Sequence, residues 1–369
     1  MAGAEHGVFK EKLSPFLKRK REEAMNNPAE CKEVLHFIER EYLQNPLESQ
    51  VKRYENDRHY ESRLEATFEG EILKGVEKLY RRTLLIEPTT VCAAHCRWCL
   101  RGQYDILHLN EAQLERFARY CGQAPENKEV REVLVTGGDP LMIVDRLNYL
   151  LDAIEHYAQN VQIVRIGTRV PVQDPARVNN KMLDVLRPSR AFLIEIATHI
   201  NHPAELFPEV KEAYRKLKEN GLTIYNQSVL LRAFNDNIGI LSRLFDELRY
   251  MGIEIHYLFH CIPLRGMEHH RTSINRGLNL IKQLTASGLT SGRCKPMFTL
   301  LTDVGKVTLY DGTILERDRE NRVLLQTGYS YEERMKWNPH WRLPSTAQVD
   351  RNGLLQVWYL DASEIQHGE

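Results

Sequence analysis

Between residues 83 and 301, short apolar runs alternate with longer polar, helix-like segments, and this alternation restricts the chain to few folds. The apolar runs are rich in Val, Ile and Leu and lack internal polar alternation, which indicates strands covered on both faces. A strand–helix–strand pattern repeated about six times predicts a parallel sheet. The predicted strands are TLLIEP, EVLVTG, QIVRIG, FLIEIAT, LTIYNQSVLL, IEIHYLFH and KPMFTLL. The predicted helices between them are NEAQLERFARYC, VDRLNYLLDAIEHYA, NKMLDVLRP, FPEVKEAYRKLKENG, IGILSRLFDELRYMG and SINRGLNLIKQLTASG.

Unusual polar clusters follow nearly every predicted strand. The clusters are TTVCAAHCRWC, GGDP, TRVPV, THINHP, NQSVLLRAFND and HCIPLRG, in strand order. In an open sheet such chemistry gathers at one switch point, whereas in a barrel all the carboxyl ends of the strands meet at one mouth. We therefore expect an α/β fold, with a partial (β/α)6 TIM-type barrel across residues 81–301.

The two ends of the chain differ from the barrel region in texture. Residues 1–80 are charged and periodic, with CKEVLHFIEREYL and LEATFEGEILKGVEKLY as examples, and predict a helical N-terminal segment. Residues 302–369 predict a small C-terminal extension. Within it, GKVTLYDGTILERD is expected to form a hairpin with Asp311 and Gly312 at the turn.

Composition excludes several classes of protein. The 50 Lys and Arg residues balance 50 Asp and Glu, so no overall charge attracts the chain to nucleic acid or to an anionic membrane. The apolar runs are too short to span a membrane and the N-terminus lacks a signal-peptide core, so we expect a cytoplasmic protein. Seven cysteines, an odd number, favour reduced thiols over disulfides. A small-molecule substrate is the expected partner, and the oligomeric state is not indicated.

Cys92, Cys96 and Cys99 follow the first predicted strand with the spacing C-x3-C-x2-C. Three thiolates on one loop can hold a [4Fe–4S] cluster and leave one iron open for a ligand. A structural zinc site would need a fourth ligand, such as His95 or a distant cysteine. A chance group of buried thiols is a third alternative. The spacing favours the cluster, because an open metal position is where a substrate binds.

This cysteine motif, with Trp98 before its last cysteine, resembles the signature of the radical S-adenosyl-L-methionine (SAM) superfamily. Over residues 75–300, further segments are similar in order and spacing to those of lysine 2,3-aminomutase and its relatives. These segments are VTGGDPL, RIGTRVPVQDPARV, THINHPAEL, NQSVLLRAFND, FHCIPLRGMEHHRTSI and LTSGRCKPMF. The resemblance implies a radical SAM core whose cluster cleaves SAM to a 5′-deoxyadenosyl radical that abstracts hydrogen. It also implies a reductant partner such as flavodoxin or ferredoxin.

The resemblance further implies a SAM site at the strand ends. Gly137 and Gly138 would let the backbone come close, Asp139 would supply an acceptor to the SAM amino group, and Trp98 would pack near the adenine. The alternatives are a tight turn for the two glycines and a core position for the tryptophan. The residues that fall where SAM or substrate is touched are Thr168, Arg169, His199, Asn201 and Gln227, each of which could equally be a strand-end polar residue satisfied within the fold.

The sequence departs from the aminomutases where these bind pyridoxal phosphate (PLP). In the family, a lysine in a Gly-rich loop after the last barrel strand forms the PLP imine. Here Lys306 is the nearest candidate for the imine lysine, with Gly305 as the one glycine beside it. In the simpler alignment the Gly-rich loop is deleted and Lys306 only begins a hairpin. In the family, an Arg-rich run after the third cysteine helps hold the PLP phosphate, whereas this chain has only Arg101 there. A phosphate group would therefore have fewer cationic partners. We expect no PLP, with a PLP-dependent aminomutase that uses Lys306 as the alternative.

The substrate site departs as well. Ile262 stands where the lysine-specific enzymes have an acidic residue for the distal ammonium, which makes lysine an unexpected substrate. Arg265, Arg271 and Arg293 are candidates for a substrate carboxylate or phosphate, or else for surface salt bridges. Asp303 is the candidate carboxylate.

These features predict a radical SAM enzyme of the isomerase or lyase type. Hydrogen abstraction from a small, amino-acid-like substrate would be followed by rearrangement, elimination or epimerisation. From another class, the alternative is a zinc-stabilised binding or regulatory barrel without SAM chemistry.

Overall fold

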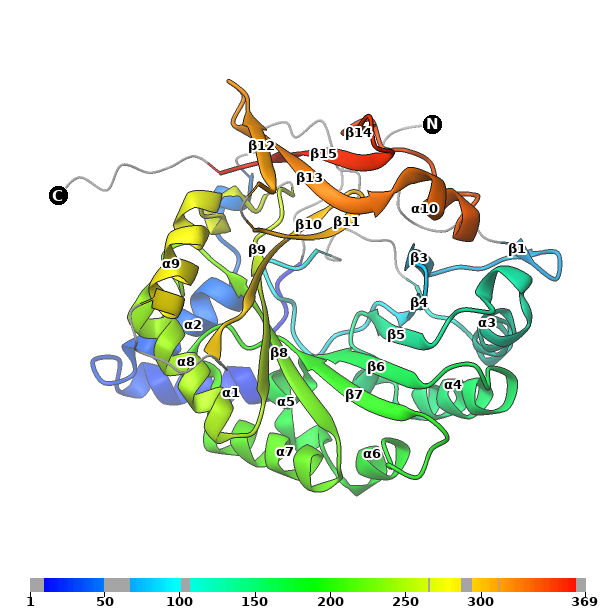
Figure 1. Cartoon of the computed structure of the whole chain (residues 1–369). Helices are drawn as coiled ribbons and strands as arrows, with labels where there is room; N and C mark the ends of the chain where they lie inside the picture. The colour runs from blue at the N-terminus through cyan, green and yellow to red at the C-terminus, as the bar shows by residue number, and fades with distance from the viewer. Residues whose placement is uncertain are drawn as a thin grey trace.

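The central element of the protein is a curled sheet with parallel strands in chain order (Figure 1). The computed structural model describes residues 10–49, 67–100, 107–264, 266–286, 294–310 and 312–362. All seven predicted strands are present and pair with one another in parallel, so the predicted partial barrel is confirmed. The strands are β4 (Thr83–Thr89), β5 (Glu132–Gly137), β6 (Ile163–Thr168), β7 (Leu193–Thr198), β8 (Thr223–Leu230), β9 (Glu254–His260) and β10 (Met297–Thr302).

Helices cover the outer face of this sheet (Figure 1). Their limits follow local capping signals, as in the first of them, where Asn110 and Gln113 form a capping box. Side chains at helical spacing point toward the sheet, and the buried strands read as near-continuous apolar runs. The main helices are α3 (Glu111–Gln123), α4 (Val144–Tyr157), α6 (Asn180–Val185), α7 (Pro208–Glu219), α8 (Ile238–Tyr250) and α9 (Ile274–Ala286), with the one-turn α5 (Val170–Gln173) after β6.

The N-terminal segment is only partly helical. Helices α1 (Pro15–Asn26) and α2 (Lys32–Tyr42) and the 3-10 turn η1 (Pro46–Ser49) agree with the prediction. The helical prediction is wrong for the described residues 67–80, which form β1 (Thr67–Phe68), β2 (Glu71–Ile72) and the edge strand β3 (Val76–Tyr80). The reason lies at the turn, where Glu69 (φ 54°) and Gly70 (φ 78°) are left-handed and close a two-residue hairpin.

The hairpin predicted for GKVTLYDGTILERD is also wrong. Strand β11 (Gly305–Thr308) forms an antiparallel hairpin with the preceding strand β10 and extends the barrel sheet. In the tight turn between them, Thr302 is paired with Gly305. Gly305 has a φ of 124°, which only glycine adopts easily. Of the expected turn, Asp311 lies outside the described residues. The remaining C-terminal strands form an antiparallel sheet in the order β12 (Ile314–Arg317), β13 (Arg322–Ser330), β15 (Leu354–Leu360) and β14 (Ala347–Val349), and α10 (Tyr331–Trp337) follows β13.

In the described ranges, no helix combines the length and apolar character needed to cross a membrane.

Candidate active site

The three clustered cysteines line one cavity of about 320 Å³, together with residues from the carboxyl ends of the parallel strands. Cys92, Cys96 and Cys99 lie on the loop after β4. The loops after β5, β6, β7 and β9 add their own residues to the same cavity, and β8 contributes Gln227 and Val229 near its carboxyl end. The strand ends that carry polar clusters in the sequence therefore share one space, as expected for a barrel mouth.

The three thiols are prepared for a metal centre rather than for free reactivity. Burial raises the pKa of Cys92 above its ordinary value and that of Cys96 to about 12, the latter against the lowering effect of Arg169. Both remain protonated at neutral pH unless a metal displaces the proton. Within the described residues, the three sulfurs do not gather within 4.8 Å of one another. A single zinc ion with Zn–S bonds of about 2.3 Å needs closer sulfurs, so the donor set fits a polynuclear cluster better.

N-terminal residues hold the cysteine loop from outside the barrel. Lys12 donates to the Cys92 carbonyl at 2.7 Å, and the His95 backbone donates to the Lys12 carbonyl. The His95 ring contacts the Lys10 carbonyl at 2.7 Å through Nδ1, so this nitrogen has a partner within the chain. The N-terminal segment thus forms part of the wall behind the loop.

Arg169, at the end of β6, organises a buried charge network beneath the loop. Its guanidinium donates to the Cys96 sulfur at 2.8 Å, to Glu41 on α2 at 2.7 Å and to Glu205 at 2.6 Å. Burial alone would lower the pKa of Arg169, but its electrostatic interactions with Cys96, Glu41 and Glu205 raise it well above its ordinary value. The arginine therefore keeps its charge and presents a donor to one cysteine sulfur.

Glu41 connects this arginine with two other predicted residues. The carboxylate is fully buried and accepts hydrogen bonds from the Trp98 indole at 2.6 Å and the Asn201 amide at 2.7 Å. Burial raises the pKa of the neighbouring Glu205 to about 7, against the lowering effect of Arg169. Arg169 thus lies between two buried carboxyl groups, those of Glu41 and Glu205.

Gly137 and Gly138 bring the turn after β5 against the cysteine loop. The Gly138 backbone donates to the Thr89 carbonyl at 2.6 Å, and a Cβ at Gly138 would lie 2.5 Å from the backbone of Thr90 and Val91. Gly137 has a φ of 103°. The pair is therefore needed for close backbone packing, which is the first part of the role expected for it.

Asp139 is buried and engaged by donors of its own chain. Its carboxylate accepts from the Thr168 hydroxyl at 2.8 Å and from the backbone of Leu141, Arg169 and Val170. Burial raises its pKa although these four donors oppose the shift. Asp139 and Thr168 thus fix the start of the segment that carries Arg169.

The other predicted SAM residues divide into two groups. Trp98, His199 and Gln227 line the cavity, and the rings of Trp98 and His199 lie 5.6 Å apart between centroids. Asn201 is not among the lining residues, because its side chain is used by Glu41 and by the Val229 backbone at 2.7 Å.

A second group of charged residues lines the cavity on strands β3, β6 and β11. Arg165 pairs with Glu132 at 2.6 Å and with Glu195 at 3.5 Å. Lys306 places its ammonium 4.7 Å from the Tyr257 ring centroid. Glu77 on β3 also lines this space. These groups could receive a zwitterionic ligand.

Of the four predicted substrate residues, the two that the structure describes, Arg271 and Asp303, do not line this cavity. Arg271 is fully buried and donates to the Cys261 carbonyl at 3.1 Å and the Leu360 carbonyl at 2.5 Å, so it ties the loop after β9 to β15. Asp303 accepts from Thr346 at 2.8 Å in the β10–β11 turn. Neither lines the cavity. Arg265 and Arg293 lie outside the described residues, as does Arg101.

Comparison with known proteins agrees with this geometry. Residues 86–239 match the model of the Radical SAM superfamily. A protein named "Putative L-lysine 2,3-aminomutase" from Aquifex aeolicus (strain VF5) is 32% identical over 292 residues, which cover 79% of this chain and 73% of that protein. The chain belongs to the lysine 2,3-aminomutase family of radical SAM proteins.

Other relatives in the family are longer than this chain. L-lysine 2,3-aminomutase of Fusobacterium nucleatum subsp. nucleatum is 33% identical over 230 residues, covering 61% of this chain and 52% of that protein. Glutamate 2,3-aminomutase of Clostridioides difficile (strain 630) is 34% identical over 228 residues, with 60% and 52% covered. The chain thus spans about half the length of these two relatives.

Three residues of this radical SAM site were missed in the sequence. Gln173 donates to the Cys96 sulfur at 3.2 Å and accepts from the Ala94 backbone, and Glu205 and Glu41 bind Arg169. The signal for Glu41 was its place on the apolar stripe of α2, beside Phe37 and Ile38. An acidic residue on a buried face needs a buried partner.

Proposed function

We propose that this protein is a radical SAM enzyme that abstracts hydrogen from a small, amino-acid-like substrate without PLP. The observation that carries the proposal is that the three cysteines and the charged residues Arg165, Lys306 and Glu77 line the same cavity. A substrate bound by those charges would lie in the space that the cysteine loop faces. An aminomutase-like rearrangement, an elimination or an epimerisation would follow.

When bound, the cluster and SAM supply one-electron hydrogen-abstraction chemistry. The chain itself holds the cluster loop through the Arg169 and Gln173 donors to Cys96. Hydrogen bonds to a cluster sulfur influence its reduction potential. Ile262 and Phe259 provide apolar wall that limits water near a reactive species.

The remaining chain residues would recognise the substrate. Lys306 and Arg165 are suited to a carboxylate, and Glu77 is suited to an ammonium group. Ile262 lines the cavity where the lysine-specific relatives carry an acid, so a substrate with a second ammonium finds no carboxylate at that point of the wall.

The geometry of the β10–β11 turn supports the absence of PLP. Thr302 pairs directly with Gly305, and the Thr302 hydroxyl donates to the Gly305 carbonyl at 2.7 Å. This turn leaves two residues, Asp303 and Val304, between the strands, which is too short for a Gly-rich phosphate loop.

The test is anaerobic reconstitution with iron and sulfide, followed by incubation with SAM, a reductant and deuterated amino acids. We expect cluster absorption, formation of 5′-deoxyadenosine and deuterium transfer into it from the true substrate. Cys96→Ala should abolish all three, whereas the control Cys31→Ala, outside the cavity, should keep them. Wild-type protein that forms no cluster, or that retains one zinc ion on these cysteines, would refute the proposal.

A PLP-dependent aminomutase is the second candidate, because the Lys306 side chain lines the cavity. Borohydride treatment of protein incubated with PLP should then leave a reduced adduct on Lys306 by peptide mass spectrometry. Lys306→Arg keeps the charge but cannot form the adduct. A PLP adduct trapped on Lys306, together with loss of turnover in Lys306→Arg, would overturn the PLP-free proposal. Formation of 5′-deoxyadenosine without added or bound PLP would support the PLP-free proposal.

A further inference from the structure

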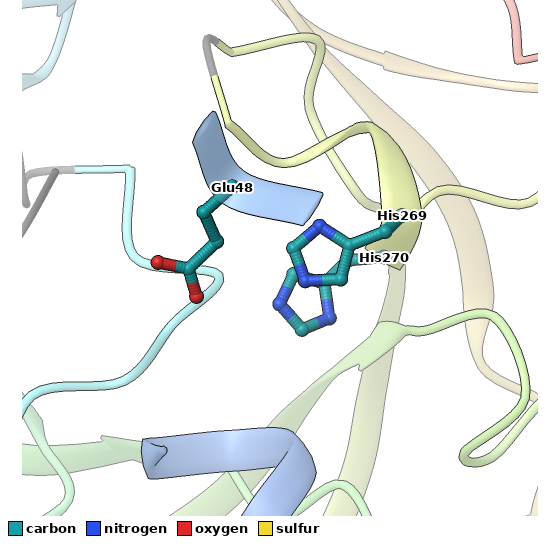
Figure 2. Close-up of side chains that lie close together, drawn as sticks. All are labelled: Glu48, His269 and His270. Atoms are coloured by element: carbon teal, nitrogen blue, oxygen red, sulfur yellow. The ribbon is translucent and has the colours of Figure 1, made fainter. Parts of the chain in front are cut away.

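A second group of metal-ligating side chains lies apart from the cysteines. Glu48 on η1 and His269 and His270 on η7 (Glu268–His270) each offer one ligand atom, and these atoms lie within 4.8 Å of one another. Figure 2 shows the two imidazoles side by side, with the Glu48 side chain entering from the N-terminal segment. The group thus joins two segments that are far apart in the sequence.

The buried histidine of this group lacks a hydrogen-bond partner. His270 is 2% exposed, and neither of its ring nitrogens has a partner among the described residues. A neutral imidazole carries one donor and one acceptor, and leaving both unsatisfied in the interior is costly. A metal ion bound by one nitrogen would relieve half of that cost.

Glu48 is already oriented for such a role. Arg97 donates to both of its oxygens, with 2.8 Å between Nε and Oε1. Oε1 also accepts from the Asn45 backbone at 3.2 Å, whereas Oε2, which accepts from Arg97, keeps a further lone pair for a metal ion. Carboxylates that bind metals are commonly held by such second hydrogen bonds. Arg97 therefore fixes the carboxylate without preventing coordination.

The electrostatic surroundings act in two directions. Burial, with His269, Arg40 and Arg97 nearby, lowers the pKa of His270 well below its ordinary value, so the ring is neutral, as a ligand must be. The same two arginines repel a dication. Since Glu48 neutralises Arg97, this repulsion weakens metal binding without preventing it. We therefore expect a lower affinity for a divalent ion than in a structural zinc site with four protein ligands.

We propose that Glu48, His269 and His270 bind a divalent transition metal ion of the imidazole-preferring class, with zinc as the reference ion. Two imidazoles and one carboxylate complete three of four tetrahedral positions and leave the fourth to water. Tetrahedral ligands with bonds of about 2.1 Å lie about 3.4 Å apart, so small side-chain rotations would close the group around an ion.

The expected consequence is mechanical. The ion would tie η1 to the loop between β9 and α9, and through Arg97 to the cysteine loop, in which Arg97 follows Cys96. The site is independent of the proposed reaction, because none of its three ligands lines the cavity.

The test uses the full-length, anaerobically reconstituted protein with zinc ions as the probe. We expect added zinc to raise the melting temperature and to bind at one equivalent beyond the cluster iron. In His270→Gln the affinity should fall at least tenfold, the loss typical of a disturbed metal site. The control His340→Gln, at an exposed histidine, should bind as the wild type does.

Zinc captured by the cluster cysteines is distinguished with a second protein, in which Cys92, Cys96 and Cys99 are all serine. Zinc binding that persists there and is lost on adding His270→Gln supports the site. If that protein does not fold, the difference in zinc-dependent melting between wild-type and His270→Gln holoprotein decides. Equal zinc affinity of His270→Gln and wild type would overturn the proposal.

Discussion

Replacing Glu41 by glutamine should destabilise the protein and alter its cluster. The carboxylate accepts three hydrogen bonds of 2.6–2.7 Å, from Arg169, Trp98 and Asn201, in a fully buried position. Breaking a buried ion pair from one side costs about 3–5 kcal/mol. Glu205 remains as a second counter-ion for Arg169, so we expect the lower end, about 3 kcal/mol.

The first measurement is urea unfolding under anaerobic conditions, with the exposed Glu39→Gln on the same helix as the matched control. Glu39→Gln should change the free energy of unfolding by no more than about 0.5 kcal/mol. The second is a redox titration of the reconstituted cluster. Loss of a negative charge beside the Arg169–Cys96 hydrogen bond should raise the midpoint potential. A Glu41→Gln protein with wild-type stability and potential would show that the network does not hold the loop.

Three further substitutions test other parts of the fold. Gly138→Ala forces a Cβ to within 2.5 Å of the cysteine-loop backbone and should prevent cluster incorporation, which is measured by the absorption of the cluster. The control Gly328→Ala, whose added Cβ would meet no atom within 4 Å, should leave incorporation unchanged. Burial lowers the pKa of His260 to about 3, so stability should fall below pH 6.5 as the unfolded state takes up the proton, by about 2 kcal/mol at pH 5. His260→Asn should flatten this pH profile of urea unfolding; an unchanged slope would contradict the assignment. Arg271→Lys should lower the melting temperature without weakening substrate binding, and a selective rise in KM would instead restore its role as a substrate ligand.

The parallel strands and the cysteine loop could be predicted because their signals are local. Apolar runs such as EVLVTG and the C-x3-C-x2-C spacing need no knowledge of distant residues. Glu41 could not be assigned a partner, since Arg169 is 128 residues away in the chain. The sequence marks a residue that needs a buried partner but does not name that partner.

The wrong predictions concern turns rather than elements with a strong period. Residues 67–80 alternate charges in a way that suits a helix, but the Glu69–Gly70 turn makes a hairpin. At the other end, Asp311–Gly312 is a common turn signal, yet the Gly305 turn is formed first along the chain and pairs β11 with β10. The sequence also does not distinguish a buried arginine that binds carbonyls, as Arg271 does, from one that binds a substrate.

The link between Glu41 and the barrel also constrains the order in which the protein matures. During synthesis α2 leaves the ribosome long before Arg169 and Asn201, the latter 160 residues further along. Until β6 and β7 are in place, Glu41 has none of these partners and the cysteine loop lacks its rear support. Cluster insertion should therefore be a late event, and truncated chains that end before residue 201 should accept iron and sulfide poorly although all three cysteines are present.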